Sequence, residues 1–332
     1  SRIMGLDVLR RGLDESAVTV QHLRHFILNN SQVQVRCGGH CVSYPDLGRE
    51  YLVSLIQRAA ATGDPDIEEV VFSVPPGSPL MFREWLGSVA AGSGITKYSV
   101  MDEISAAAAG YGFSLEDDMV LMVIDIGDEK TTVTLASLGP RETLNGSRII
   151  ARTISDLSGT AIDCWIAHEV RQRDTRKPGS WGSGGLSPEL LAACRKARTD
   201  LTCGDTAKIF FTEGRTGENI ARPFSGQDLE NTIHMNKGLF ELDRVISQTL
   251  ILGESRGHSS GSIQHVLMTG KDSLIPSLQA VIVSKFGRER VHCNLPATAV
   301  ALGAALHPAG TENSRTLERD YALRYWDAGT SR

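Results

Sequence analysis

Asp125 and Gly127 lie in a short polar turn between two apolar runs, and their types and spacing suit phosphate or metal binding. Residues 119–138 read MVLMVIDIGDEKTTVTLASL, which predicts a β-hairpin with Asp125 at the end of its first strand. A carboxylate there can hold a divalent metal through water, and a tight turn presents N–H groups to phosphate oxygens. The pattern predicts one half of a phosphate clamp, and the alternative is an ordinary hairpin with an acidic turn.

Hydrophobic spacing and turn residues predict the elements that position this hairpin. Before it, we expect short helices over 2–32, a hairpin over 33–44, helices over 46–61, 80–91 and 104–109, and strands over 70–74 and 97–101. After it, we expect helices over 164–173, 189–201 and 228–253, strands over 207–213, 219–224 and 263–268, and a further helix behind Pro276. Ser187 is expected to cap the helix over 189–201.

The composition is that of a soluble globular protein, with 332 residues, 41% hydrophobic and 22% charged. This length allows a large core and two lobes. The net charge of -5 gives no reason to expect nucleic acid as a partner. Because no apolar run reaches membrane-spanning length and the start lacks a signal-peptide pattern, we expect no membrane partner and a cytoplasmic location.

Six cysteines are scattered along the chain, and in a chain of this size free thiols are expected rather than disulfides. Cys37 and Cys41 flank Gly38-Gly39-His40 and suggest a metal site, but a closed zinc site needs further ligands. The alternative is a hairpin with a two-residue Gly38-Gly39 turn, and the sequence favours the hairpin.

Segments before and after the central hairpin together resemble a known family. Residues 68–75, Arg83 and residues 101–112 follow one another in the order and at the spacing of the ATPase domain of seventy-kilodalton heat-shock chaperones, members of the actin, hexokinase and heat-shock superfamily. The resemblance continues over roughly residues 2 to 308. It implies an actin-like α/β fold with two lobes and a nucleotide cleft.

The resemblance also implies how the chain divides. Residues 1–120 would be the remainder of the first lobe, 121–308 the second lobe with an inserted subdomain at about 174–253, and 309–332 a C-terminal tail. The family's first phosphate hairpin would lie upstream of residues 2–5, and Asp7 is a poor substitute because no glycine follows it closely. We therefore expect an incomplete N-terminal β-lobe, and no client-binding domain in this chain.

By resemblance, the ligand is ATP or ADP with Mg²⁺, Asp125 holds the Mg²⁺ through water, and Glu103 lies near the attacking water. Pro75 and Arg83 match residues that relay nucleotide state. Each has a structural alternative: Pro75 as a strand terminator, Arg83 as a solvated helix residue, Glu103 as a helix cap. The residues implied to contact the nucleotide are Gly127, Lys130, Thr131, Gly159, Arg198, Gly270 and Asp272.

Several expected contact residues are changed. Arg195 replaces a glutamate that would accept a ribose hydroxyl, Lys271 replaces a glycine, and Leu274 replaces an arginine that would stack on adenine. Glu129 adds negative charge where a γ-phosphate would lie, and two like charges at about 4 Å repel by roughly 1 to 4 kcal/mol. Lys130 is a candidate to compensate for it.

Three functions follow from the pattern. The first is a divergent heat-shock-type chaperone nucleotide-binding domain, with protein clients or co-chaperones as partners and weak or absent ATP hydrolysis. The second is a pseudo-ATPase that serves as a protein-interaction or regulatory module, favoured by Glu129, Lys271 and Leu274. A sugar or acetate kinase of the same superfamily is disfavoured, because the order of Pro75, Arg83 and the Ala-rich helix has no reason to occur there.

Overall fold

The computed structural model describes residues 20, 22–37, 40–62, 67, 69–139, 147–173, 186–202, 204–213 and 217–306. Predictions for residues 2–19, for the upstream phosphate turn and for the tail over 309–332 lie outside these ranges. Within the predicted helical segment 2–32, the described part contains one short helix, α2 (Leu23–Leu28). It packs on the long helix α3 (Tyr44–Thr62).

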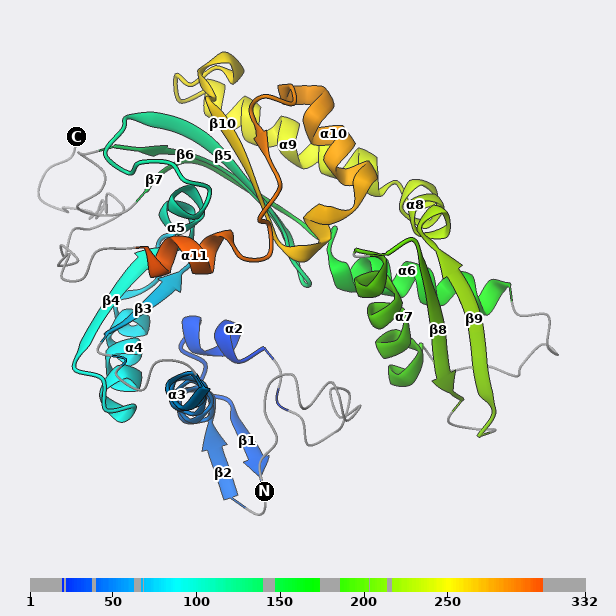
Figure 1. The fold of residues 1–332 in the computed structure, drawn as a ribbon, viewed down its shortest axis with the longest axis horizontal. Coiled ribbons are helices and arrows are strands. Elements are labelled where there is room, and N and C mark those ends of the chain that lie inside the picture. The colour runs from blue at the N-terminus through cyan, green and yellow to red at the C-terminus, as the bar shows by residue number, and fades with distance from the viewer. Residues whose placement is uncertain are drawn as a thin grey trace, which may run out of the picture.

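A five-stranded mixed sheet forms the centre of the molecule (Figure 1). Its strands are β5 (Met119–Ile126), β6 (Thr131–Leu138), β7 (Arg148–Ser155), β10 (His265–Thr269) and β11 (Val291–His292). The order across the sheet is β11-β10-β5-β6-β7, in which β5 runs parallel to β10 and antiparallel to β6. The predicted hairpin is confirmed, with Ile126 paired to Thr131 across its turn.

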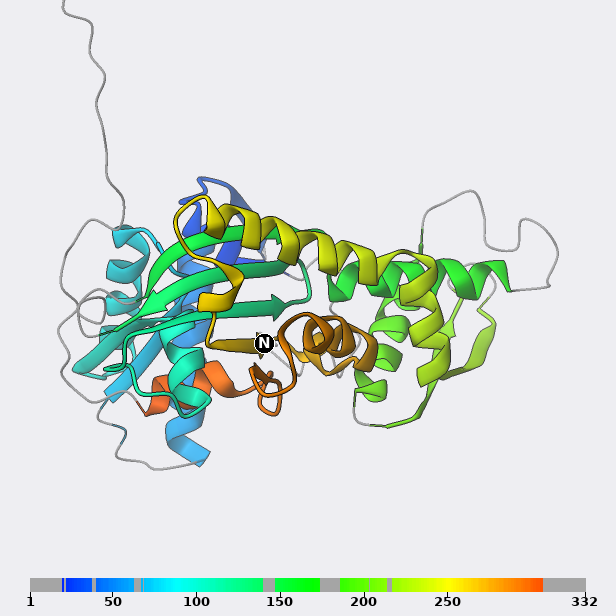
Figure 2. The ribbon, with the colours of Figure 1, turned by 90° about the horizontal axis from the view of Figure 1, so that it is seen from above.

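Alternating side chains of β5 place apolar groups on both faces of this sheet, so helices cover both. Met122, Ile124 and Ile126 belong to the larger core, whose helices include α9 (Gly238–Glu254) and α10 (Pro276–Phe286). Helix α9 lies along β6 and β7 (Figure 2). Leu121 and Val123 face the other side, against the Ala-rich helix α5 (Glu103–Gly110).

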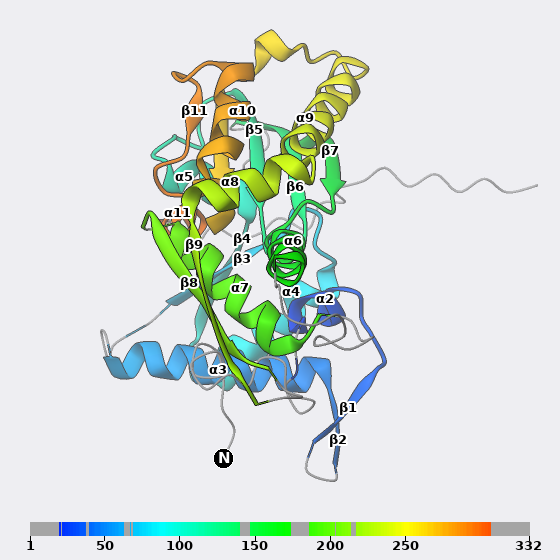
Figure 3. The ribbon, with the colours of Figure 1, turned by 90° about the vertical axis from the view of Figure 1, so that its right-hand side faces the viewer.

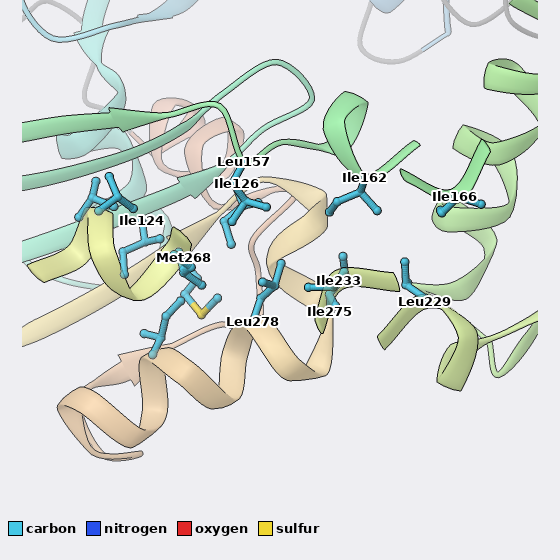
Figure 4. Close-up of a cluster of buried hydrophobic side chains, with 14 of the residues drawn as sticks. Ile124, Ile126, Leu157, Ile162, Ile166, Leu229, Ile233, Met268, Ile275 and Leu278 are labelled. Carbon is cyan, nitrogen blue, oxygen red and sulfur yellow. The ribbon is translucent and has the colours of Figure 1, made fainter. Parts of the chain in front are cut away.

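The larger core continues beyond the sheet into a helical and β extension. Ile126 and Met268 of the sheet lie near Leu278 and Ile275, and the apolar cluster extends to Ile162 and others on α6 and α8 (Figure 4). The extension contains α6 (Gly159–Gln172), α7 (Pro188–Leu201), the antiparallel pair β8 (Thr206–Thr212) and β9 (Asn219–Ser225), and α8 (Gly226–Met235). Figure 3 shows this extension towards the viewer.

The N-terminal part contains two small two-stranded sheets. The hairpin β1 (Gln34–Cys37) and β2 (His40–Ser43) confirms the hairpin prediction over 33–44. Strands β3 (Glu69–Val74) and β4 (Lys97–Asp102) run parallel, joined by helix α4 (Leu80–Gly92), as predicted. The described cysteines at 41, 164, 194 and 293 are free thiols, as expected.

Helix α5 packs closely against α11 (Ala299–Ala305) through small residues. A Cβ on Gly303 would overlap the carbonyl oxygen of Ala106, and one on Gly110 would overlap that of Ala299. Backbone therefore touches backbone between these helices, which only glycine allows at these two positions. The acid that caps α5 is Asp102, which accepts from the N–H groups of Ile104 and Ser105 at 3.0 Å, so the alternative of Glu103 as the cap was wrong.

Two predicted helix boundaries were also wrong. Helix α6 begins five residues before the predicted start at 164, because the Ser158 side chain accepts from the Ala161 N–H and caps it there. The helix predicted over 228–253 is two helices, because Lys237 adopts a left-handed conformation with φ 60° between α8 and α9. Ser225 caps α8 through a reciprocal capping box with Asp228.

Candidate functional site

A cavity of about 400 Å³ lies where strands β5 and β10 of the central sheet and strands β3 and β4 of the N-terminal part end. Asp125 ends β5, Thr269 ends β10, Pro75 follows β3 and Glu103 follows β4. The carboxyl ends of parallel strands are where open α/β sheets usually bind ligands. The cavity is lined by Arg24, Pro75, Pro76, Glu103, Ile104, Val123, Asp125, Thr132, Thr134, Arg152, Thr269, Gly270, Lys271, Pro296, Ala297 and Val300.

Glu103, Asp125 and Gly270, which the sequence places far apart, line this one cavity. Asp125 accepts a 2.8 Å hydrogen bond from the Thr269 hydroxyl on the neighbouring strand. Burial raises the pKa of Asp125, and the Thr269 hydrogen bond and the charges of Arg24 and Arg152 oppose that rise. The carboxylate is thus placed and polarised by two strands, as a metal-holding group would be.

Glu103 is the first residue of α5 and is already engaged. Arg24 of α2 donates a 2.9 Å hydrogen bond from Nη1 to Oε1 of Glu103. Burial raises the pKa of Glu103, and the charge of Arg24 lowers it in part. A water beside Glu103 would therefore share this carboxylate with a guanidinium.

Cations and hydroxyls in the cavity include residues that sequence reasoning missed. Arg24 comes from α2, Arg152 from β7, and Lys271 from the 3-10 helix η2 (Lys271–Leu274). Thr134 pairs with Arg152 in the β6–β7 register, so the two lie side by side at the cavity wall. The alternation of Thr132 and Thr134 with buried neighbours was the signal available in the sequence.

Polar groups of the predicted phosphate turn bond to other groups of the protein. Gly127 donates its N–H to the carbonyl of Lys130 at 3.1 Å. Lys130 pairs with Asp156, and Glu129 contacts His22. Neither Gly127, Lys130 nor Thr131 lines the cavity.

The N-terminus of α6 is also satisfied by this turn. Gly159 donates its N–H to the Gly127 carbonyl at 3.0 Å, and Thr160 donates to the Asp128 carbonyl at 2.9 Å. The first amides of a helix commonly bind anions. Here those donors are occupied by carbonyls of the β5–β6 turn.

Arg198 lies at the centre of a buried group of carboxylates, which we name the Arg198 cluster: Arg198, Asp128, Asp163 and Asp272. Its Nε donates to Asp163 at 2.7 Å, its Nη2 to Asp128 at 3.1 Å, and its Nη1 to Asp272. Arg198, Asp163 and Asp272 are each at most 2% exposed.

Burial and surplus negative charge set the protonation of this cluster. Burial raises the pKa of Asp272 to about 6 and raises that of Asp163, in both cases against the pull of Arg198. Burial lowers the pKa of Arg198, but the hydrogen bond and charge of Asp163, with Asp272 and Asp128, raise it by more. The guanidinium therefore stays charged. Its single positive charge does not balance all three carboxylates around it, so Asp272 and Asp163 bind a proton more readily than exposed aspartates do.

Gly159 lies against the Arg198 cluster. A Cβ at Gly159 would come within 2.6 Å of Arg198 Nη2 and of Asp272 Oδ2, and within 2.7 Å of Asp128 Oδ1. Three of the residues expected to contact a nucleotide, Gly159, Arg198 and Asp272, are thus brought together. They contact one another, and none of them lines the cavity.

The residues present fit one half of a magnesium nucleotide. In the described part of the chain, no group of three or more His, Cys, Asp or Glu is placed to hold a metal. Mg²⁺ commonly uses one or two carboxylates with waters and substrate phosphates, so Asp125 beside three cations fits a magnesium phosphate. Gly159, Arg198 and Asp272, which the resemblance implies for the nucleotide, bond or contact one another in this structure. Over the described ranges, none of the helices has the length and apolarity needed to span a bilayer.

The mixed sheet, its covering helices and the cavity at the strand ends define the actin-like α/β ATPase fold that the sequence predicted. The family model described as Hsp70 protein matches residues 2–318, so this chain belongs to the Hsp70 family. Hsp70 family domains bind ATP or ADP with Mg²⁺.

Among curated proteins, the chain is 25% identical over 286 residues to the chaperone protein DnaK of Deinococcus proteolyticus, covering 82% of this chain and 43% of that protein. It is 24% identical over 293 residues to the mitochondrial heat shock protein SSC3 of Saccharomyces cerevisiae, covering 85% and 43%. The chain spans less than half the length of these relatives.

Proposed function

We propose that this chain is a divergent heat-shock-type chaperone nucleotide-binding domain that binds ATP or ADP with magnesium and hydrolyses ATP weakly or not at all. One observation carries the proposal: Glu103, Asp125 and Gly270 come from three separate segments and line one cavity with three cations. Membership in the Hsp70 family supports it. Protein clients or co-chaperones would be its partners.

Within this proposal, Asp125 would hold Mg²⁺ through water, and Arg24, Arg152 and Lys271 would bind phosphate oxygens. Bound Mg²⁺ would supply charge neutralisation at the phosphates. Glu103 would orient a water. We also propose that residues 1–120, 121–308 with an insertion at about 174–253, and 309–332 are separate parts of the chain.

Four hydrogen bonds support weak or absent hydrolysis. Glu103 is held by Arg24 at 2.9 Å, which reduces its capacity to accept from a water. The N–H groups of Gly127, Gly159 and Thr160 donate hydrogen bonds to backbone carbonyls. Because these three amides are occupied, they would not supply the preorganised stabilisation of developing charge that lowers the barrier to phosphoryl transfer.

A second candidate is a pseudo-ATPase that serves as a protein-interaction or regulatory module. The Arg198 cluster favours it, because protein side chains occupy the space beside Gly159. Under this candidate, the fold alone would be retained.

Calorimetric titration with ATP and Mg²⁺, combined with phosphate-release kinetics, tests the proposal. We expect measurable binding that Asp125→Asn removes, and turnover far below the ~1 s⁻¹ lower end of ordinary enzymes. Asp117→Asn, an exposed acid before β5, is the matched control and should bind as the unmodified protein does. No heat at millimolar nucleotide would leave the second candidate, and turnover at or above ~1 s⁻¹ would refute weak hydrolysis.

A further inference from the structure

The guanidinium of Arg24 holds one of the two acids that line the cavity. Its Nη1 donates a 2.9 Å hydrogen bond to Oε1 of Glu103, and both side chains line the cavity together with Asp125. Burial raises the pKa of both acids, and the charge of Arg24 lowers both, so this cation acts on Asp125 as well. Of the two lining acids that could hold a divalent cation, Glu103 is therefore already paired.

Helix α2 is docked in a way that carries Arg24 to this position. Ile27 is buried in the N-terminal core, and Phe26 stacks on Tyr44 at the start of α3, with ring centroids 4.1 Å apart. His22, just before the helix, contacts Glu129 of the β5–β6 turn. Packing on one side and a polar contact on the other thus place α2 beside the cavity.

The Arg24 side chain can serve Glu103 and a ligand at the same time. It is 68% exposed, and a guanidinium carries several N–H donors in a fixed planar arrangement. One donor can remain on Glu103 while others contact a phosphate oxygen.

We propose that Arg24 makes metal binding in the cavity depend on phosphate. The inference rests on the proposed nucleotide binding and deepens it, because it names the form in which the metal is accepted. That form is a magnesium–phosphate complex and not the free ion.

The charges that line the cavity favour the complex. Three cations, Arg24, Arg152 and Lys271, accompany two acids, Glu103 and Asp125, so the lining carries one surplus positive charge. A free divalent cation would add to this surplus, whereas the magnesium complex of ATP is an anion and would offset it.

The supply of oxygen ligands favours the complex as well. Mg²⁺ is commonly held by one or two carboxylates and takes its other ligands from waters and substrate phosphates. With Glu103 on Arg24, Asp125 is the one lining carboxylate left for a metal, and it also accepts a 2.8 Å hydrogen bond from Thr269. A metal that arrives with its own phosphate oxygens needs no second carboxylate.

Calorimetric titrations with MgCl₂, with and without ATP and at fixed ionic strength, test the inference. The unmodified protein should bind Mg²⁺ together with ATP, and should not bind Mg²⁺ alone at up to about 10 mM. Arg24→Ala frees Glu103 and removes a cation, so this variant should bind Mg²⁺ alone with a dissociation constant of about 1 mM or below. Its affinity for ATP with Mg²⁺ should fall by about threefold or more, because a phosphate contact is lost.

Three further variants show whether this gain of metal binding acts through Glu103. Adding Glu103→Gln to Arg24→Ala should abolish the binding of Mg²⁺ alone. Arg24→Lys keeps a cation beside Glu103 and should exclude free Mg²⁺ as the unmodified protein does. Arg36→Ala, at an exposed arginine of β1, is the matched control and should change nothing. Thermal melting without ligand verifies that each variant folds.

The outcomes separate this inference from the proposed function. Saturable binding of Mg²⁺ alone to the unmodified protein below about 10 mM, or exclusion of Mg²⁺ alone by Arg24→Ala, would overturn the inference and leave the proposed function intact. Binding of Mg²⁺ alone to Arg24→Ala that Glu103→Gln does not remove would also overturn it. Failure of ATP with Mg²⁺ to bind the unmodified protein would overturn both.

Discussion

Asp272 shows how burial changes the chemistry of a carboxyl group. It is 2% exposed and faces Arg198, Asp163 and Asp128. Three carboxylates around one fully buried guanidinium carry more negative charge than it balances, although Arg195 also approaches Asp163 at 3.5 Å. Protonation of this buried cluster therefore makes the free energy of unfolding depend on pH.

Asp272→Asn should flatten the pH dependence of stability between about pH 4 and pH 6. The folded-state pKa of about 6 lies above the ordinary aspartate value of 3.8, so the folded protein binds more protons than the unfolded chain in this window. The free energy of unfolding then falls as pH rises from about 4 to 6, by at most about 3 kcal/mol from this group. Urea unfolding at half-unit pH steps measures it, with exposed Asp200→Asn as control. An unchanged slope in Asp272→Asn would show that Asp272 does not titrate in this range.

At this scale, the sequence predicted which residues meet but not all of what they do. Asp125, Glu103 and Gly270 were chosen from segment order and type, and they share a cavity. Arg24 and Arg152 were missed, because their positions depend on how α2 docks and on the β6–β7 register. The ion pairs of Arg198 involve Asp128 and Asp163, which no local pattern connects with it.

At the scale of elements, helices α5 and α11 pack backbone against backbone because small residues line their interface. The run of alanines over 104–109 predicted helix α5 correctly, and the contact of Gly303 with Ala106 shows why small residues are needed in α11. Helix ends were harder to predict. Helix α6 starts after Ser158, which is extended and caps it, and α8 ends before Lys237, which is left-handed. Each boundary therefore depends on the backbone conformation of one residue.

Gly303→Ala is predicted to destabilise the protein by about 1 to 3 kcal/mol, the usual range for overpacking. The new Cβ would overlap the backbone carbonyl of Ala106, so the helices must move apart. Thermal unfolding would measure the loss, and Ala301→Leu, on the exposed face of α11, adds more bulk as a control without strain. Equal stability of both variants would show that the two helices can separate freely.

At the scale of the whole molecule, the cavity and the extension are distinct regions. The cavity is lined by α2, α5, the central sheet and the approach to α11, whereas α7, β8 and β9 lie at the far end of the molecule (Figure 1). The Arg198 cluster lies between them and joins α6 and α7 to the turn after β5. A ligand bound in the cavity through its phosphates would contact the cavity residues and not α7, β8 or β9.

Hydrogen exchange should show this division. With Mg²⁺ and either ATP or tripolyphosphate, peptides covering β5, β6 and residues 269–274 are expected to exchange more slowly, because the ligand orders the cavity wall. Peptides covering β8 and β9 should not change with either ligand. Mass spectrometry measures the exchange, and slower exchange of β8 and β9 with either ligand would contradict binding confined to the cavity.

Helix α2 bridges two parts of the molecule by two adjacent contacts. His22, at its N-terminus, contacts Glu129 of the β5–β6 turn, and Arg24 holds Glu103 of α5. The side chains of His22 and Glu129 are about half exposed, and in the second pair Arg24 is exposed whereas Glu103 is mostly buried. Helix α2 therefore joins the β5–β6 turn to the start of α5 beside the cavity, and its Arg24–Glu103 contact should weaken as ionic strength rises.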